Sequence, residues 1–136
     1  MTQDSDQLKK KKVLVTGAAG GIGRTVVSKF RERGAYVAVT DFSVSDIAAD
    51  AHFAGDLMEA AFCDALPKRA SEALGGLDIL INNAGIIRRG NITVATDEDY
   101  TFSMAVNVEA PFRLCRASIP LMAQSGGGSI VNTASC

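Results

Sequence analysis

The chain has 136 residues, a formal net charge of −1 and a hydrophobic content of 47%, which suits one soluble globular domain able to bury a core. The balanced charge argues against nucleic acid or an anionic membrane surface as a partner, and no apolar run reaches the length of a membrane span. Three scattered cysteines and a single histidine offer no spacing for a zinc site or a disulfide framework, so we expect no metal and reduced thiols, as in the cytoplasm.

The first part of the sequence predicts a strand, a helix and a second strand. Residues 13–16 are an apolar run typical of a buried parallel strand. Apolar residues then recur with helical spacing over 22–30, and Gly34 stands where a C-terminal cap is expected. Residues 36–40 predict the second strand, which ends at Asp41. Together these segments have the size of one strand–helix–strand unit.

Three further elements follow in the middle of the chain. Residues 51–54 predict a short third strand, and residues 58–74 have an alanine-rich, helical composition. Pro67 interrupts that pattern, so we expect either a kink or two short helices with Pro67 at the start of the second. Residues 77–81 predict a fourth, apolar strand, which continues the alternation of strands and helices.

The last third of the chain predicts one long helix and a fifth strand. Thr96 and Asp99 have the spacing of a capping box, and the helix is expected from Asp97 to about Gln124. The residues expected to form its buried stripe are Phe112, Cys115, Ile119 and Met122, and those expected to bend it are Pro111 and Pro120. A glycine-rich stretch ends the helix, and residues 129–133 predict the fifth strand.

Strands that alternate with helices predict an α/β fold, a Rossmann-type doubly wound parallel sheet with helices on both faces. Right-handed crossovers give the strand order 3-2-1-4-5. Ligands of such sheets bind at the carboxyl ends of the strands, where the order reverses beside the first strand. Residues 1–136 contain no linker and no internal repeat, so we interpret them as a single domain.

The stretch Thr16-Gly17-Ala18-Ala19-Gly20-Gly21-Ile22-Gly23 joins the first strand to the first helix. Glycines at this position let the chain turn sharply and let the backbone approach an anion closely. The free N–H groups of the following helix, with its positive dipole end, then face a phosphate. A glycine motif alone also fits a simple turn, but the strand before it, the helix after it and Asp41 beyond provide the context that dinucleotide binding requires.

With the spacing Gly17-x-x-x-Gly21-x-Gly23, the sequence resembles the short-chain dehydrogenase/reductase family, whose signature is Thr-Gly-x-x-x-Gly-Ile-Gly. The other features that match the family, in order, are Asp41, Asp56-Leu57, Asn82-Asn83-Ala84-Gly85, Asn107 and the stretch from Ser129 to Ser135. The resemblance implies an oxidoreductase that transfers a hydride between a nicotinamide cofactor and a secondary alcohol or ketone, with a small molecule as its substrate.

Within this resemblance, the chemistry of the residues favours NAD as the cofactor. Asp41 can accept hydrogen bonds from both hydroxyls of the adenosine ribose, and its charge repels the 2′-phosphate of NADP; a turn or capping aspartate is the alternative. By resemblance, Asp56 binds the adenine amino group with help from the Leu57 backbone, although an aspartate after a glycine also suits a turn. Asn83 is also expected to steady the central sheet. The expected cofactor residues are Gly17, Gly21, Ile22, Gly23, Asp41, Asp56, Leu57, Asn83, Ala84 and Gly85.

Two residues resemble catalytic groups of the family. Asn107, in the long helix, resembles the asparagine that anchors a water in a proton relay; a polar residue that faces solvent is the alternative. Ser135, after the fifth strand, resembles the serine that hydrogen-bonds the substrate oxygen. The tyrosine and lysine of the family's Tyr-x-x-x-Lys motif are absent, because neither Tyr36 nor Tyr100 has a lysine four residues later.

Without that motif and the strands after it, the chain resembles the N-terminal part of such an enzyme, truncated after strand 5 and incomplete at its C-terminus. We expect it to bind NAD weakly and to turn over nothing alone. The alternative is a catalytically silent NAD-binding module or sensor, and a P-loop protein is less consistent because no Gly-Lys-Ser/Thr follows the glycines. The family commonly forms dimers or tetramers through the long helix, so the full-length form is expected to be a homo-oligomer.

Arg88 is the candidate substrate residue, together with Ser135. The segment Ile86-Ile87-Arg88-Arg89 follows the Asn-Ala-Gly turn, and a guanidinium there can clamp a carboxylate with two hydrogen bonds. Sugar-acid dehydrogenases of the family often carry a similar Asn-Asn-Ala-Gly-Ile-x-Arg stretch, so the resemblance implies a sugar or a sugar acid. A pair of solvated loop arginines is the alternative.

Overall fold

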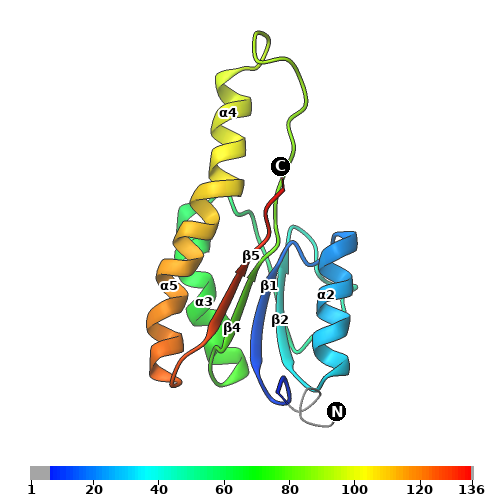
Figure 1. Cartoon of the computed structure of the whole chain (residues 1–136), viewed down its shortest axis with the longest axis vertical. Coiled ribbons are helices and arrows are strands. Elements are labelled where there is room, and N and C mark those ends of the chain that lie inside the picture. The colour runs from blue at the N-terminus through cyan, green and yellow to red at the C-terminus, as the bar shows by residue number, and fades with distance from the viewer. Residues whose placement is uncertain (1–6, 136) are drawn as a thin grey trace.

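Five strands form one sheet in the computed structural model, which describes residues 7–135 (Figure 1); Cys136 lies outside them. Their bounds are Lys12–Thr16 (β1), Tyr36–Asp41 (β2), Ala51–Ala54 (β3), Ile79–Asn82 (β4) and Ser129–Asn132 (β5). The order across the sheet is β3-β2-β1-β4-β5, and every neighbouring pair is parallel. The predicted strand order is confirmed, and the carboxyl ends of all five strands lie at one edge.

Helices cover both faces of this sheet. Their bounds are Gly21–Glu32 (α2), Ala60–Leu74 (α3), Asp97–Met104 (α4) and Ala110–Gln124 (α5), with a π-helical turn, η1, at Ala105–Glu109. Helix α2 packs on β1 and β2 from one side, while α3 and α5 pack against each other on the opposite face (Figure 1). This is the doubly wound arrangement that the alternating pattern predicts. None of the helices in residues 7–135 is long and apolar enough to cross a membrane.

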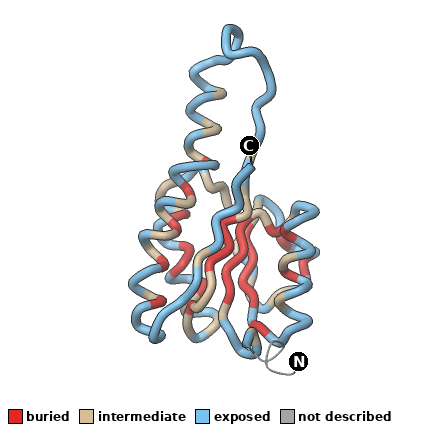
Figure 2. The backbone as a smooth tube through the Cα atoms, viewed as in Figure 1, coloured by how far each residue is buried: buried red, intermediate tan, exposed pale blue. Residues whose placement is uncertain are grey.

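The central strands are buried on both faces because successive side chains of a strand point to opposite sides. Val13 and Val15 of β1 belong to the apolar cluster under α2, whereas Leu14 belongs to the cluster under α3 and α5. Figure 2 shows this burial in the middle of the sheet and its loss towards β5, where Val131 is half exposed. Among the described residues, β5 pairs only with β4 and is an edge of the sheet.

Helix α3 runs as one helix although Pro67 lies in its interior, so of the two expected alternatives the division into two helices is wrong. A proline removes one backbone hydrogen bond from a helix. The buried residues of α3 are Cys63, Leu66, Pro67 and Ala70. Pro67 is itself part of this buried face, so its packing against the sheet and α5 offsets the lost hydrogen bond. The helix therefore continues through a residue that ordinarily interrupts one.

The long helix differs from the prediction in its path and in its buried face. The helical path from Asp97 to Gln124 contains the π turn, and Pro111 lies two residues after that turn, where its missing N–H coincides with the change in the helical hydrogen-bond pattern. Phe112 and Ile119, which were expected to be buried, are 59% and 55% exposed. The buried residues of α5 are Ala110, Leu114, Ser118 and Met122. These residues lie four apart on one ridge, and its small members let α5 approach α3 closely.

The predicted capping box is present at the start of α4. The Thr96 hydroxyl accepts a hydrogen bond from the Asp99 backbone N–H at 3.1 Å, and the Asp99 carboxylate accepts one from the Thr96 N–H at 3.2 Å. The bond from the Thr96 backbone, followed by that from its side chain, lowers the pKa of Asp99. Since α4 contains no buried residue, this cap is its main local support.

Candidate functional site

The turn between β1 and α2 depends on two glycines. Gly17 has a φ of 63°, and a Cβ on it would lie 2.8 Å from the Cα of Ala84. A Cβ on Gly23 would overlap the carbonyl oxygen of Gly17. A Cβ on Gly21, in contrast, would meet no atom within 4 Å. The fold therefore needs Gly17 and Gly23, whereas Gly21 faces open space.

The amino end of α2 faces this open space. Gly20 is its N-cap residue, and no side chain of the described residues caps it. Ile22, in the first turn, is 69% exposed. Backbone N–H groups at such a helix end, together with the positive end of the dipole, suit an anion such as a phosphate.

The buried hydroxyl of Thr16 ties the end of β1 to the loop after β4. Its oxygen accepts hydrogen bonds from the backbone N–H groups of Asn83 and Ala84 at 3.1 and 2.9 Å, and it donates to the Ile81 carbonyl at 3.4 Å. The Asn83 side chain donates to the Gly17 carbonyl at 3.3 Å. The sequence pattern does not assign Thr16 this role; its signal is a hydroxyl at the last position of an apolar strand.

A cavity of about 110 Å³ opens at the carboxyl ends of β1 to β4. The predicted cofactor residues that line it are Gly17, Asp41, Asp56, Leu57, Ala84 and Gly85. The lining residues that were not predicted are Phe42, Gly55, Ile86, Phe102 and Val106. Phe102 and Val106 come from α4 and η1, so the long helix forms one wall of the cavity. Their spacing of four residues on a predicted helix is the signal that could have found them.

Asp41 ends β2 at the wall of the cavity and is only partly buried. One carboxylate oxygen accepts the backbone N–H of Ala19, in the glycine-rich turn, at 3.0 Å. The other accepts the N–H of Phe42 at 2.8 Å. Because an ionised carboxylate has about four acceptor positions, Asp41 can support this turn and still accept hydrogen bonds from a ligand.

The loop after β3 carries Asp56 and Leu57. Asp56 accepts the backbone N–H of Met58 through one carboxylate oxygen at 2.9 Å, which is a local turn contact. The Leu57 carbonyl accepts the thiol S–H of Cys63 at 3.3 Å. Asp56 therefore makes the turn that its position after a glycine suggests, and it also lines the cavity.

Asn107 lies in the π turn and joins the long helix to the loop after β4. Its side-chain oxygen accepts the Ile86 N–H at 2.9 Å, and its side-chain nitrogen donates to the Ile86 carbonyl at 2.9 Å. Turns of this kind are frequent at functional sites. The carboxamide retains one N–H and one lone pair that these two hydrogen bonds do not use.

Ser135 follows β5 at the same edge of the sheet and is exposed. Three residues before Ser135, the side chain of Asn132 is held by β4, because the Asn82 amide donates to its oxygen at 2.9 Å. Ser135 is not among the residues that line the cavity.

Arg88 also lies outside the cavity lining and contacts α4. Its guanidinium carbon lies 4.4 Å from the centroid of the Phe102 ring, and its Nε lies 4.0 Å from a carboxylate oxygen of Asp99. The Arg88 side chain is about half exposed, so the ion pair contributes little to stability.

A parallel sheet of this order, a glycine turn after β1 and an aspartate that ends β2 beside a cavity define a Rossmann-type α/β domain. A family profile described as short chain dehydrogenase matches residues 11–136. The chain belongs to the short-chain dehydrogenase/reductase family of oxidoreductases.

Related sequences span longer chains. An uncharacterized oxidoreductase of Thermotoga maritima is 41% identical in an alignment of 136 positions, gaps included, that covers 92% of this chain and 53% of the relative. D-threitol dehydrogenase of Mycolicibacterium smegmatis is 34% identical over 95% of this chain and 54% of its own length. Galactitol 2-dehydrogenase of Agrobacterium fabrum is also 34% identical, with the same coverage. The chain thus spans about half the length of these relatives.

Solved structures of the family have the same arrangement. A short chain dehydrogenase of Burkholderia cenocepacia in complex with NADP has a TM-score of 0.83 and 31% identity, over 96% of this chain and 57% of that one. An NADH-dependent reductase, A1-R′, complexed with NAD has a TM-score of 0.85 and 27% identity, over 96% of this chain and 62% of that one. Both forms of the nicotinamide cofactor therefore occur among the structural relatives.

Proposed function

We propose that the chain is the cofactor-binding part of an NAD-linked oxidoreductase that interconverts a secondary alcohol and a ketone of a polar metabolite. The observation that carries this proposal is Asp41, whose carboxylate stands at the cavity wall beside the glycine-rich turn. A carboxylate there can accept hydrogen bonds from ribose hydroxyls, and its charge repels a 2′-phosphate.

The residues that line the cavity, together with the neighbouring amino end of α2 and Asn83, which lie outside its lining, suit a dinucleotide. The open space at Gly21, above an uncapped helix end, would receive the pyrophosphate. Asp41 keeps acceptor positions for the ribose, and Asp56 keeps one for the adenine amino group. Asn83, Ala84 and Gly85 would pass close to the cofactor; the nicotinamide would supply the hydride acceptor or donor.

The reacting end of the site would use Asn107 and Ser135. The carboxamide of Asn107 is held by Ile86 through two hydrogen bonds, and its remaining N–H and lone pair could hold a water. Ser135 would donate a hydrogen bond to the substrate oxygen. Because no Tyr-x-x-x-Lys pair is present in these 136 residues, the proton transfer itself would need groups outside this sequence.

The cofactor proposal is tested by titrating the purified chain with NAD and with NADP in a calorimeter. We expect weak binding of NAD, at least about tenfold weaker binding of NADP, and no turnover of either cofactor with polyols or sugars. Equal or tighter binding of NADP would remove the assignment to NAD. Oxidation of a polyol by the 136-residue chain would remove the view that it lacks essential proton-transfer groups.

We propose a polyol, a sugar or a sugar acid as the substrate class. The names of two relatives, D-threitol dehydrogenase and galactitol 2-dehydrogenase, support the first, because threitol and galactitol are both polyols. Arg88 supports the third, since a guanidinium near the cavity could bind a carboxylate. Its ion pair with Asp99 is long, at 4.0 Å, and leaves the guanidinium available for a stronger partner.

The Arg88 proposal is tested by Arg88→Ala in a full-length enzyme that carries this segment. For a sugar-acid substrate we expect KM to rise about tenfold or more, with a smaller change for the neutral sugar, because only the acid offers a carboxylate to pair with. Arg88→Lys keeps the charge but cannot form two parallel hydrogen bonds with a carboxylate. Its KM for the sugar acid should therefore lie between that of the original enzyme and that of Arg88→Ala. A KM for the acid that Arg88→Ala leaves unchanged would show that Arg88 is a solvated loop residue.

The alternative of a catalytically silent NAD-binding module stays a prediction; in a longer protein that contains this segment, a Tyr-x-x-x-Lys pair would favour the enzyme and its absence would favour the module. A homo-oligomer of the full-length form stays a prediction, supported by the half-exposed apolar side chains of Val108, Phe112 and Ile119 along the long helix. A cytoplasmic location likewise stays a prediction.

A further inference from the structure

The loop from Gly55 to Leu57 forms one side of the cavity, and its conformation decides where Asp56 stands. The Gly55 N–H donates to the Asp41 carbonyl at 3.0 Å, which continues the pairing of β2 with β3 by one residue. Beyond that bond the chain leaves the sheet, so other contacts must hold the rest of the loop.

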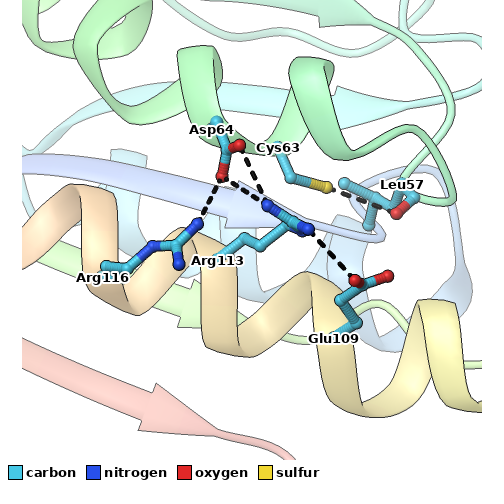
Figure 3. A network of polar contacts seen from close by, with 6 residues as sticks. All are labelled: Leu57, Cys63, Asp64, Glu109, Arg113 and Arg116. Atoms are coloured by element: carbon cyan, nitrogen blue, oxygen red, sulfur yellow. Dashed lines mark hydrogen bonds and ion pairs between the residues drawn. The ribbon is translucent and has the colours of Figure 1, made fainter.

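Two consecutive residues in the first turn of α3 make those contacts. The ring of Phe62 lies against Gly55 so closely that a Cβ on Gly55 would overlap three of its ring carbons. The thiol of Cys63 donates to the Leu57 carbonyl at 3.3 Å (Figure 3). The backbone is therefore held on both sides of Asp56, because Gly55 before it and Leu57 after it both contact α3.

Both contacts are made by side chains that pack into the interior of the molecule. Cys63 is fully buried, and Phe62 is partly buried against the cluster under α3 and α5. On the side of α3 that faces α5, Asp64 accepts hydrogen bonds from Arg113 and Arg116 at 3.0 and 3.2 Å (Figure 3). The turn that carries Phe62 and Cys63 is thus fixed from two sides.

The thiol stays a hydrogen-bond donor over the physiological range. Burial, followed by the negative charge of the neighbouring Asp64, raises the pKa of Cys63 to about 11. A thiolate could not donate to the Leu57 carbonyl, so the raised pKa protects the contact. A thiol is a weak donor, and its value here is to fix the orientation of one peptide group.

We propose that Phe62 and Cys63 are positioning residues for the adenine end of the cofactor site. They act through the loop: Phe62 fixes Gly55, Cys63 fixes Leu57, and Asp56 between them is held where it can accept a hydrogen bond from an adenine amino group. This inference rests on the proposed cofactor function and adds to it two residues that do not line the cavity.

The test compares ligands that contain adenine with one that does not. NAD, AMP and nicotinamide mononucleotide are titrated into the original chain and into Phe62→Leu and Cys63→Val, with binding followed by NMR. We expect the Kd for NAD and AMP to rise about fivefold to tenfold in both variants, with little change for nicotinamide mononucleotide. Cys63→Ser keeps a donor at this position and should restore binding. Phe30→Leu changes a partly buried ring of α2 on the opposite face of the sheet, away from the cavity lining, and is the matched control for Phe62→Leu.

Amide hydrogen exchange of Asp56, Leu57 and Met58 gives a second measurement that needs no ligand. Faster exchange of these amides in Cys63→Val, with recovery in Cys63→Ser, supports the positioning role. If Phe62→Leu fails to fold, the Val and Ser variants of Cys63 decide the question. Unchanged Kd values for NAD and AMP in Cys63→Val would overturn the inference and leave the cofactor site intact. If the original chain binds none of the three ligands, the proposed function fails, and this inference fails with it.

Discussion

Replacing Gly21 by alanine is expected to weaken NAD binding at least about tenfold and to leave the stability of the fold almost unchanged. A methyl group at this position meets no protein atom within 4 Å, so the free energy of unfolding should stay within about 1 kcal/mol of the original. The same methyl would occupy the open space at the amino end of α2, where we place the pyrophosphate. Calorimetric titration with NAD and urea unfolding measure the two quantities separately.

Gly23→Ala is the matched comparison, because it adds the same methyl group two residues further on. There the Cβ would overlap the Gly17 carbonyl oxygen and approach the Ala18 Cα at 2.9 Å, so the backbone of the turn must move. Overpacking of this kind costs about 1–3 kcal/mol, and the distorted turn should lose NAD as well. If Gly21→Ala binds NAD as the original chain does, the pyrophosphate does not lie over this helix end.

Asp41→Asn is expected to lower the affinity for NAD by about tenfold to a hundredfold and to bring the affinities for NAD and NADP close together. The charge is lost, so each hydrogen bond accepted from the ribose weakens from about 1.5–3 kcal/mol to the roughly 0.5–1.5 kcal/mol of a neutral acceptor. The repulsion of a 2′-phosphate is lost at the same time. The asparagine oxygen can still accept the Ala19 N–H, while its NH2 group replaces the oxygen that accepts the Phe42 N–H, so the change costs one local hydrogen bond and keeps the one that supports the glycine-rich turn. Titration with both cofactors measures the ratio of the two dissociation constants.

Asp46→Asn is the control for this change in charge. Asp46 lies on the loop that follows β2, pairs with Arg24 at 3.0 Å and does not line the cavity. The substitution Asp46→Asn should therefore leave the ratio of the dissociation constants for NAD and NADP unchanged. A preference for NAD that persists in Asp41→Asn would show that Asp41 serves the turn alone, the alternative that its two backbone hydrogen bonds leave open.

The strands and their order could be predicted because their signals are local. Each strand is an apolar run bounded by glycine or polar residues, and right-handed crossovers leave few arrangements for such a series. The residues at the strand ends follow from the same reasoning, so Asp41, Asp56 and Ala84 were expected at one edge and do line one cavity. Phe102 and Val106 were not expected there, since a wall supplied by another element depends on how the long helix packs.

The buried face of α5 shows why packing could not be predicted from the pattern. The stripe of Phe112 and Ile119 is more apolar than the ridge of Ala110 and Ser118, and the less apolar ridge faces the core. Close approach of two helices favours small side chains at the contact, and hydrophobicity alone does not report this requirement. Pro67 shows the same limit of sequence patterns. The α3 face that contains it is buried, and this burial offsets the hydrogen bond that the proline removes.

The sequence alone determined the parallel sheet, the glycine-rich turn and the aspartate at the end of β2, because each depends on the order of neighbouring residues along the chain. Only the tertiary structure decided how these parts are held. The Thr16 hydroxyl links two strand ends, Asn107 holds Ile86 at the cavity wall, and Cys63 holds Leu57 from the adjoining helix. The first two contacts join residues more than 20 positions apart, and no local pattern of apolar and polar residues specifies such pairs.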